Sequence, residues 1–387
     1  MSKKIRLGDI ATLITKGTTP TSVGFNFTES GVNFVKIESI REDGTFIPEK
    51  FAHISDECNI KLKRSQLQEN DILFSIAGAI GRTAVVTKEC LPANTNQALA
   101  IIRMPHGVID YRFLLYALQS DAVMEQSDKQ KQGVAQLNLS LQNINDFEIP
   151  FFTEKEQNEI VEVLSSVDDL LRMRTQQLEQ LDELVKSRFI ELFGDQKANP
   201  FGWPQTTIGD CCTLKSGTSL PADKENEGGR IPYVKVGDMN YPGNEQYITT
   251  SSRFVTEQTA GAGIFPVGTV IFPKRGGAIG TNKKRLTTLP ICADLNVMGV
   301  TAGNALKSQY LMAYFNMVDL GALDNGSSVP QINNKDIAPL VICLPPLALQ
   351  EQFAAFVEQT DKSKLAVQKS LEKLEVLKKS LMQKYFG

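Results

Sequence analysis

The chain carries the same long amphipathic segment twice. Residues 176–194, QQLEQLDELVKSRFIELFG, return as residues 369–387, KSLEKLEVLKKSLMQKYFG, at a constant offset (369 − 176 = 193). Under this offset Leu178 falls on Leu371, Leu181 on Leu374 and Gly194 on Gly387. A repeat of about half the chain length indicates a duplicated architecture, in which each half contributes one globular part and one helix.

Both copies belong to a longer heptad pattern. Of ten positions spaced alternately by four and three residues, eight are apolar from Ile160 to Leu192 and seven from Phe353 to Tyr385. An apolar seam with a period of 3.5 residues favours a partner helix along its whole length. The residues that we assign to this seam are Leu164, Leu171, Leu178, Leu181, Val185, Val357, Val367, Leu371, Leu374 and Leu381.

The charges of the two segments indicate that they pair with each other. Residues 153–194 hold ten acids and five bases, a net charge of −5, whereas residues 346–387 hold five acids and seven bases, a net charge of +2. Opposite balances favour this pairing over self-association. A compact domain between the helices returns the chain beside its exit point, so we expect an antiparallel pair. The alternative is two separate surface helices, each packed on its own domain.

Composition limits the remaining possibilities. With 42% hydrophobic and 22% charged residues and a net charge of −3, the chain is of ordinary globular type. Its start has no apolar stretch of signal-peptide length, and no run approaches 18 apolar residues, so we expect a cytoplasmic protein without a membrane span. The six cysteines form no C-x-x-C pair and there are only two histidines, which argues against a zinc site.

The motifs of common enzymes are missing as well. There is no G-x-x-x-x-G-K-[ST] phosphate loop, and both histidines lie in the first half, so a hydrolytic triad in each half is excluded. We therefore expect a chain that is not an enzyme and binds no metal. A near-neutral charge means that any DNA contact must come from local clusters of basic residues or from a partner.

The two globular parts share a series of short motifs. RLGDIATL aligns with TTIGDCCTL, VNFVKIESI (32–40) with IPYVKVGDM (231–239), and NDILFSIAGAIG (70–81) with GTVIFPKRGGAIG (268–280). The alternation of apolar and polar residues predicts strands, and the Gly/Thr/Ser/Pro stretches predict loops between them. We predict an α+β fold of two pseudo-symmetric domains, 1–152 and 195–345, separated by antiparallel coiled-coil helices over 153–194 and 346–387.

Polar loop residues that follow the predicted strands are the candidates for DNA contact. In the second half a basic cluster flanks the Ala-Ile-Gly turn, which suits phosphates and guanine edges but is also common in solvated hairpins. Amides at 94–97 and 293–296 could bind adenine edges or satisfy turns, and the loops that begin residues 133–150 and 326–345 could face a ligand. The candidates are Lys16, Thr18, Thr19, Thr21, Ser22, Lys36, Ser75 and Arg82 in the first half, and Lys215, Ser216, Thr218, Ser219, Lys235, Asp238, Lys274, Arg275, Lys283, Lys284 and Arg285 in the second.

The ordered set of motifs, repeated twice, resembles type I restriction–modification specificity subunits. Each half opens with L/I-G-D and G-T, passes through V-K and A-I-G, and ends in a Glu-Gln-led helix that closes with Phe-Gly. The resemblance implies two target-recognition domains that bind double-stranded DNA, and docking of two methyltransferase subunits and of restriction/translocase subunits. It places S-adenosylmethionine, and ATP with Mg, on those partners.

The resemblance implies a split DNA site, in which each domain reads one half and the helices set the spacer between the halves. The competing hypothesis is a coiled-coil scaffold that presents two protein- or glycan-binding modules, which the near-neutral charge also suits. Salt-dependent binding to duplex DNA would separate the two hypotheses.

Overall fold

The computed structural model describes residues 3–105, 107–130, 138–323 and 329–387 and divides into two compact units. Unit 1 consists of Met1–Thr175 and Lys369–Gly387, and unit 2 consists of Gln176–Gln368. Each unit contains one globular domain and half of each of two long helices, α6 (Glu154–Phe193) and α11 (Leu347–Phe386). The prediction of two long helices is confirmed.

The ends of α6 follow from its sequence. Thr153 and Glu156 form a reciprocal cap, because the backbone N–H of Thr153 donates to the Glu156 carboxylate (2.8 Å) and that of Glu156 to the Thr153 hydroxyl (3.4 Å). The helix stops where Gly194 takes a left-handed conformation (φ 75°) and its N–H donates to the Ile190 carbonyl (2.8 Å). The Phe-Gly ending of the repeat is therefore a helix C-cap.

The predicted seam is the covered side of both helices. All twenty positions of the two ladders, from Ile160 to Leu192 and from Phe353 to Tyr385, are buried or half-buried. Several apolar residues beside the ladders are exposed instead; Leu184 is 48% exposed and Val376 is 70% exposed. Other apolar residues beside the ladders, among them Phe189, Phe193 and Phe386, are buried in the cores of the globular domains.

Within each unit the two helices run antiparallel. In unit 1 the Lys378 ammonium lies 2.6 Å from the Asp168 carboxylate, and in unit 2 the Lys364 ammonium lies 2.5 Å from the Asp182 carboxylate. In unit 1 the later α6 residue of the two contacts, Asp168 after Leu164, meets the earlier α11 residue, Lys378 before Phe386. In unit 2 the same reversal holds, because Asp182 meets Lys364 whereas the later Phe189 packs with the earlier Phe353. In these two pairs the acid lies on α6 and the base on α11, as the predicted charge complementarity requires.

The described residues of the globular domain in unit 1 form three small sheets. Their strand orders are β2-β8-β5-β6, β4-β3-β7 and β1-β9. The strands are β1 (Lys3–Arg6), β2 (Leu13–Lys16), β3 (Val32–Val35), β4 (Ala52–Ile54), β5 (Ile72–Ser75), β6 (Thr83–Val85), β7 (Ala93–Thr95), β8 (Leu99–Arg103) and β9 (Glu148–Phe151). The helices are α1 (Leu7–Ile10), α2 (Asp56–Lys61), α3 (Tyr111–Gln119), α4 (Asp121–Gln130) and α5 (Leu141–Asn145).

The globular domain of unit 2 has the same plan with two added strands. Its strand orders are β11-β19-β16-β17-β13, β14-β12-β18-β15 and β10-β20. The strands are β10 (Gln205–Thr207), β11 (Cys212–Ser216), β12 (Ile231–Val234), β13 (Tyr247–Ile248), β14 (Phe254–Val255), β15 (Ile264–Phe265), β16 (Thr269–Pro273), β17 (Arg285–Thr287), β18 (Ile291–Ala293), β19 (Val297–Ala302) and β20 (Val341–Cys343). The helices are α7 (Ile208–Cys211), α8 (Glu257–Ala260), α9 (Ser308–Met317) and α10 (Asn334–Ile337).

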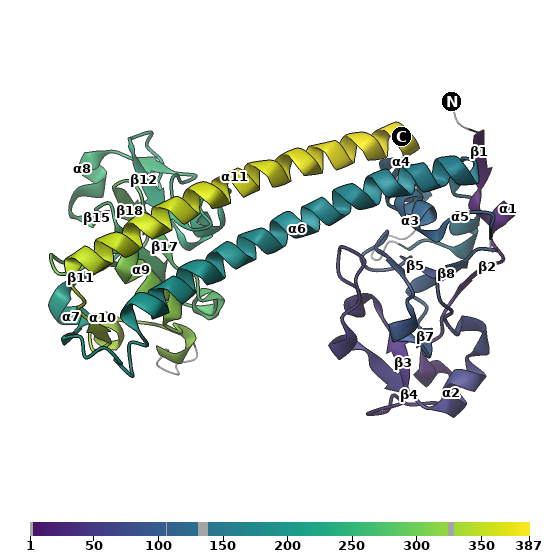
Figure 1. Ribbon diagram of the computed structural model, residues 1–387, viewed down its shortest axis with the longest axis horizontal. Coiled ribbons are helices and arrows are strands. Elements are labelled where there is room, and N and C mark those ends of the chain that lie inside the picture. The colour runs from purple at the N-terminus through teal and green to yellow at the C-terminus, as the bar shows by residue number, and fades with distance from the viewer. Residues whose placement is uncertain (1–2, 106, 131–137, 324–328) are drawn as a thin grey trace. The chain divides into compact units, whose positions relative to one another are not determined.

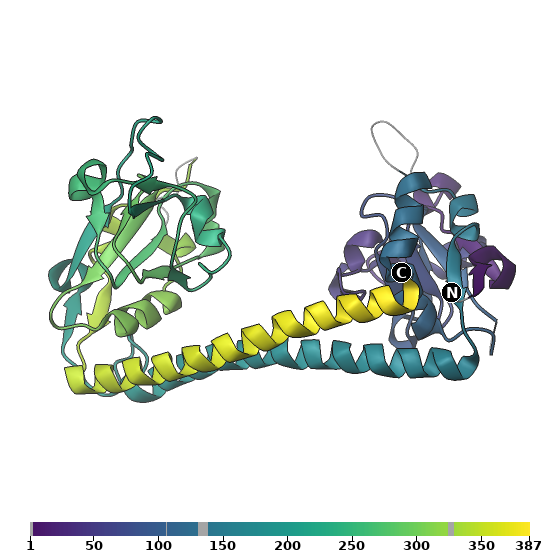
Figure 2. The ribbon, with the colours of Figure 1, turned by 90° about the horizontal axis from the view of Figure 1, so that it is seen from above.

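One core cluster in each unit joins the domain to the helix pair. In unit 1, Leu164 of α6 and Phe386 of α11 pack with Phe113 of α3, and in unit 2, Phe189 of α6 and Phe353 of α11 pack with Tyr310 of α9. Figure 1 shows the sheet that contains β5 and β8 on the helix side of the unit 1 domain, with β3, β4 and α2 farther away. Figure 2 gives the perpendicular view of the same elements.

The described residues contain neither a candidate membrane-spanning helix nor a candidate metal-binding cluster. No helix among them is both long and apolar enough to cross a membrane. In the same ranges no three His, Cys, Asp or Glu side chains come together in a way that could hold a metal ion.

Candidate nucleic-acid interface

The strand order brings the predicted polar loops of unit 1 to one edge of the central sheet. Strand β8 is antiparallel to both β2 and β5, and the register pairs Lys16 with Ala100 and Ser75 with Leu99. The ends of β2 and β5 therefore lie beside the start of β8. The loops that follow β2 and β5 and the segment that precedes β8 all emerge at this edge.

A close backbone contact fixes the first of these loops. A Cβ atom at Gly17 would lie 1.8 Å from the Thr95 carbonyl oxygen, so only glycine fits there. The next N–H, of Thr18, donates to the same carbonyl (3.2 Å), and the Thr19 hydroxyl donates to Oε1 of Gln97 (2.5 Å). The G-T motif is thus the point at which the loop after β2 is pinned to the segment before β8.

Unit 2 repeats this contact. A Cβ atom at Gly217 would lie 2.0 Å from the Asp294 carbonyl oxygen, and the Thr218 N–H donates to the Ala293 carbonyl (2.8 Å). Lys274 joins the group from the end of β16, because its ammonium donates to the Ser216 hydroxyl (2.9 Å) and its N–H to the Asn296 carbonyl (2.9 Å).

A fourth segment meets the same edge in both units. In unit 1 Ala77 forms an isolated bridge with Asn138, and in unit 2 Arg275 forms the corresponding bridge with Gln331. Residues 133–137 and 326–328 of the loops predicted to face a ligand lie outside the described residues. We call the four gathered segments the loop edge. It comprises 16–22, 76–82, 95–98 and 138–140 in unit 1, and 215–219, 274–283, 294–296 and 330–333 in unit 2.

The loop edge presents hydroxyl, amide and cationic groups, the chemistry that contacts phosphates and base edges. Thr21, Ser22, Ser219 and Arg275 are exposed. Burial, together with the neighbouring charge of Arg275, lowers the pKa of the Lys274 ammonium. An anion placed between these two cations would favour the charged form of Lys274.

Three of the predicted contact residues have buried side chains, which does not favour a surface contact. Ser75 is 0% exposed and donates to the Ala77 carbonyl (2.9 Å). Asp238 is 5% exposed and accepts hydrogen bonds from the N–H of Lys235 (2.8 Å) and the hydroxyl of Ser252 (2.7 Å). Lys284 is 4% exposed, and its ammonium donates to the Val318 carbonyl (2.6 Å) inside the domain. These groups support the fold and not a surface contact.

Several other predicted cations are half-exposed but already have partners within the domain. The Lys235 ammonium lies 2.7 Å from both oxygens of Glu225, which neutralises it. The remaining partners are the Ile40 carbonyl for Arg82 (2.9 Å), Glu38 for Lys36 (3.9 Å), the Ile264 carbonyl for Lys215 (2.8 Å), the Asn244 carbonyl for Arg285 and the Asn240 amide for Lys283. Of the predicted residues, the loop edge brings together Lys16, Thr18, Thr19, Thr21, Ser22 and Arg82, and, in unit 2, Lys215, Ser216, Thr218, Ser219, Lys274, Arg275 and Lys283.

The inward position of Lys284 predicts a pH dependence of stability. Burial lowers the pKa of its ammonium from 10.5 to about 8, so between these values the unfolded chain binds more protons than the folded one. The free energy of unfolding should therefore rise with pH from about 8 to 10, by at most about 1.4 kcal/mol per pH unit. Denaturant titrations at pH 8, 9 and 10 should show this rise in the wild type and a flatter profile in Lys284→Gln. Equal slopes of unfolding free energy against pH in the wild type and in Lys284→Gln would contradict this assignment to Lys284.

Two amides that lie at the loop edge are not among the candidate contact residues, although they belong to the amide segments expected either to bind adenine edges or to satisfy turns. Gln97 bonds Thr19, and Asn296 is held by the Asp294 carboxylate through its own amide nitrogen (2.7 Å). The amide-rich segments at 94–97 and 293–296 were the available signal. Asn94 in the first segment is fully buried and its amide donates to the side chain of Asn59 (3.0 Å), so one segment contains both a buried amide and an amide at the loop edge.

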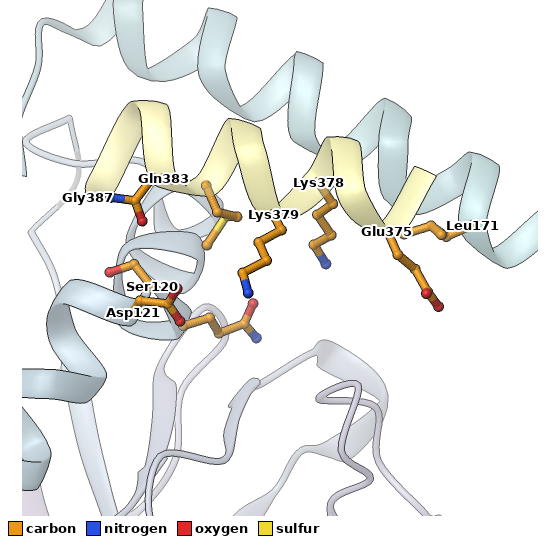
Figure 3. A pocket seen from close by; sticks show the side chains of 10 residues that line it. Ser120, Asp121, Leu171, Glu375, Lys378, Lys379, Gln383 and Gly387 are labelled. Carbon is orange, nitrogen blue, oxygen red and sulfur yellow. The ribbon is translucent and has the colours of Figure 1, made fainter. Parts of the chain in front are cut away.

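A cavity of about 320 Å³ lies elsewhere in unit 1, between the junction of α3 and α4 and the last turns of α11. Ser120 and Asp121 line one side, and Lys378, Lys379 and Gln383 line the other, as Figure 3 shows. Its lining mixes acids and bases, and no segment of the loop edge contributes to it.

Comparison with known proteins identifies the architecture. The sequence model of the type I restriction modification DNA specificity domain matches residues 2–183 and 200–378, one copy in each half. The chain belongs to this family. The two matches together span most of the chain and repeat the internal duplication found above.

Individual relatives of the family are distant in sequence. A type I restriction enzyme MjaIX specificity subunit from Methanocaldococcus jannaschii is 23% identical over 351 residues, which cover 85% of this chain and 78% of the relative. Among solved structures, the type I restriction–modification S subunit from M. genitalium has a TM-score of 0.55 at 17% identity, covering 100% of this chain and 96% of that one.

A second solved structure has a higher similarity score. This structure comes from work on complex assembly and conformational transition of the type I R-M system. It has a TM-score of 0.62 at 18% identity and covers 99% of this chain and 97% of that one. At such identities the structural likeness supports the shared fold, α+β domains in alternation with long helices.

Proposed function

We propose that this family member is the sequence-specific DNA-recognition subunit of a type I restriction–modification complex. Its globular domains, residues 1–152 and 195–345, each read one half of a bipartite asymmetric site, and the helices set the spacer. The observation that carries this proposal is the loop edge, which occurs twice on the same strand framework with different side chains. A duplicated scaffold with diverged loops suits two readers of unlike sequences.

The two loop edges differ at their equivalent bridges. Unit 1 places Ala77 beside Asn138 where unit 2 places Arg275 beside Gln331. An arginine suits the O6 and N7 acceptors of guanine, whereas amides and small apolar groups suit adenine and the thymine methyl group. The two half-sites should therefore differ in sequence, and the complete site should be asymmetric.

Methylation and cleavage would reside in partner subunits. The family match, a DNA specificity domain, occupies residues 2–183 and 200–378 and leaves no segment between them long enough for a methyltransferase domain. Two methyltransferase subunits that use S-adenosylmethionine, and restriction subunits that use ATP with Mg, would complete the assembly. The exposed apolar side chains beside the seam, among them Leu170, Leu184 and Leu365, offer surface for such partners.

Replacement of Arg275 tests direct base reading in unit 2. If its exposed guanidinium contacts a guanine edge, Arg275→Ala should weaken binding of the cognate duplex by about 1–3 kcal/mol and relax specificity at one position of one half-site. The measurement is a binding titration of the complex with methyltransferase against a set of single-base variants. Arg230→Ala, at an exposed arginine outside the loop edge, is the matched control.

Uniform weakening across all sequence variants would make Arg275 a phosphate contact instead. The proposed function itself is tested by the wild-type complex. Its affinity for duplex DNA should fall steeply as the salt concentration rises, and at fixed salt it should depend on both half-sites. Affinity that ignores the sequence of either half-site would contradict the proposal.

A further inference from the structure

One aspartate in unit 1 ties the globular domain to both long helices. The hydroxyl of Tyr116, on α3, donates to Oδ2 of Asp168, on α6 (2.8 Å). The other oxygen of the same carboxylate, Oδ1, lies 2.6 Å from the ammonium of Lys378, on α11. Figure 3 shows Lys378 on the face of α11 that looks toward the domain. Three elements that are distant in sequence therefore meet at one carboxylate.

Unit 2 contains a corresponding group. The hydroxyl of Tyr247, on β13, donates to Oδ2 of Asp361, on α11, and the side-chain amide of Gln246 donates to Oδ1 (3.2 Å). The ammonium of Lys364 lies 3.8 Å from Asp361 and 2.5 Å from Asp182, on α6. This group again joins the domain to both helices.

The two aspartates are equivalent in the internal repeat, but the two tyrosines are not. Asp361 follows Asp168 by the offset of the repeat (361 − 168 = 193). When α3 and α9 are aligned from their first residues (308 − 111 = 197), Ala313 of α9 matches Tyr116. Tyr247 comes from β13, a strand without a counterpart among the described residues of the unit 1 domain. Two elements that do not correspond in the repeat, α3 and β13, thus place a tyrosine hydroxyl against equivalent aspartates. Inheritance from one ancestral contact does not explain this.

Each aspartate lies where a contact can fix the orientation of the globular domain on the helices. In unit 1 the apolar contact between α6 and the core includes Ile160 and Leu164, and Asp168 lies one turn beyond it. In unit 2 Phe353 and Val357 are the matching core residues, and Asp361 lies one turn beyond them. Apolar packing is non-directional, whereas a hydrogen bond to a carboxylate has a preferred geometry and resists tilting.

Both tyrosine hydroxyls stay protonated and can donate to the aspartates. Tyr116 is 7% exposed, and burial and the hydrogen bond to Asp168 raise its pKa. Burial and the hydrogen bond to Asp361 also raise the pKa of Tyr247. Both hydroxyls therefore remain protonated donors over the physiological pH range.

We propose that Tyr116–Asp168–Lys378 and Tyr247–Asp361–Lys364 are orientation latches. Each latch fixes the angle at which its domain meets the helix pair, and so narrows the range of spacer lengths that the complex accepts. The inference rests on the proposed function, because spacer length has a meaning only for a bipartite site. The latch residues position the readers and do not themselves read bases.

The test measures spacer discrimination by the complex with methyltransferase. Duplexes carry both half-sites with spacers from two base pairs shorter to two longer than the native one. Tyr116→Phe and Tyr247→Phe keep the packed rings and remove the hydroxyls. Each should lower the preference for the native spacer over one-base-pair changes by about tenfold, and leave the base preference within each half-site unchanged. Asp168→Ala combined with Tyr116→Phe should change spacer discrimination by less than the sum of the two single changes, because both substitutions remove the Tyr116–Asp168 hydrogen bond.

Tyr314→Phe is the matched control in unit 2. Its hydroxyl donates to the Val341 carbonyl (2.9 Å), a bond within the globular domain, so its loss should leave spacer discrimination unchanged. If Tyr116→Phe and Tyr247→Phe behave as Tyr314→Phe does, the latch proposal is wrong.

A second readout needs no DNA. Spin labels on Lys61 of α2 and on Met173 of α6, both exposed and both in unit 1, report the orientation of the domain on its helix. Tyr116→Phe should broaden their distance distribution, and an unchanged distribution would overturn the latch. A wild-type complex without any spacer optimum would contradict the proposed function instead, and the spin-label result would still decide the mechanical role of the latch.

Discussion

Adding four residues to both long helices should lengthen the spacer of the recognised site and leave both half-sites unchanged. The insertions belong after Thr175 in α6 and after Gln368 in α11, where the chain passes between units. Each adds about 6 Å of helical rise, which corresponds to one or two base pairs at about 3.4 Å per base pair. Paired insertion keeps facing seam residues together, because both helices grow at matched positions.

Sequencing of methylated adenines in cells that carry the elongated chain and its methyltransferase measures the result. The control is an insertion in α6 alone, which shifts one seam against the other and should abolish or strongly weaken methylation. A changed half-site with an unchanged gap would contradict the assignment of spacing to the helices.

Truncation of Phe193 should cost unit 2 about 3–5 kcal/mol of unfolding free energy. Phe193 is fully buried at the end of α6, and its ring centroid lies 4.7 Å from that of Tyr310, 5.0 Å from Phe189 and 5.5 Å from Phe353. Phe193→Ala removes the ring shared by α6, α11 and α9, so the helix pair and the domain both lose their common core.

Hydrogen exchange, read unit by unit, is the suitable measurement because the two compact units need not unfold together. Phe193→Ala should lower the protection of backbone amides against exchange in unit 2 and leave that of unit 1 unchanged. Phe386→Ala should do the reverse, since Phe386 packs on Phe113 (5.2 Å) in unit 1. Ile190→Ala, at a side chain that is 48% exposed, should change little. Equal losses of amide protection in both units would contradict the division of the chain into two units that unfold separately.

The repeated pattern of the sequence was sufficient to predict the helices, because the period of apolar residues is a local property of the chain. The seam from Ile160 to Leu192 and the helix C-cap at Gly194 both appear where the pattern places them. The G-T motifs also lie where the loops were expected. Their purpose, a contact with the Thr95 or Asp294 carbonyl that excludes any side chain, becomes visible only in three dimensions.

What local patterns could not predict are contacts between residues far apart in the chain. The sequence predicts Lys284 as a surface base, but its ammonium donates to the Val318 carbonyl inside the domain. The charge of Lys235 is neutralised by Glu225, which lies on a preceding loop. The bond from Tyr116 to Asp168 spans 52 residues. Such partners depend on the tertiary fold, so neither the loss of some candidate contacts nor the latches could be derived from composition or spacing.

A map of methylated adenines in cells that express this chain with its methyltransferase tests the split site most directly. If each half of the chain reads a different sequence, the map will show one motif of two short, different specified blocks, on either side of a gap of fixed length whose bases do not matter. A single uninterrupted motif, or two identical blocks, would contradict the assignment of one unlike reader to each half of the chain.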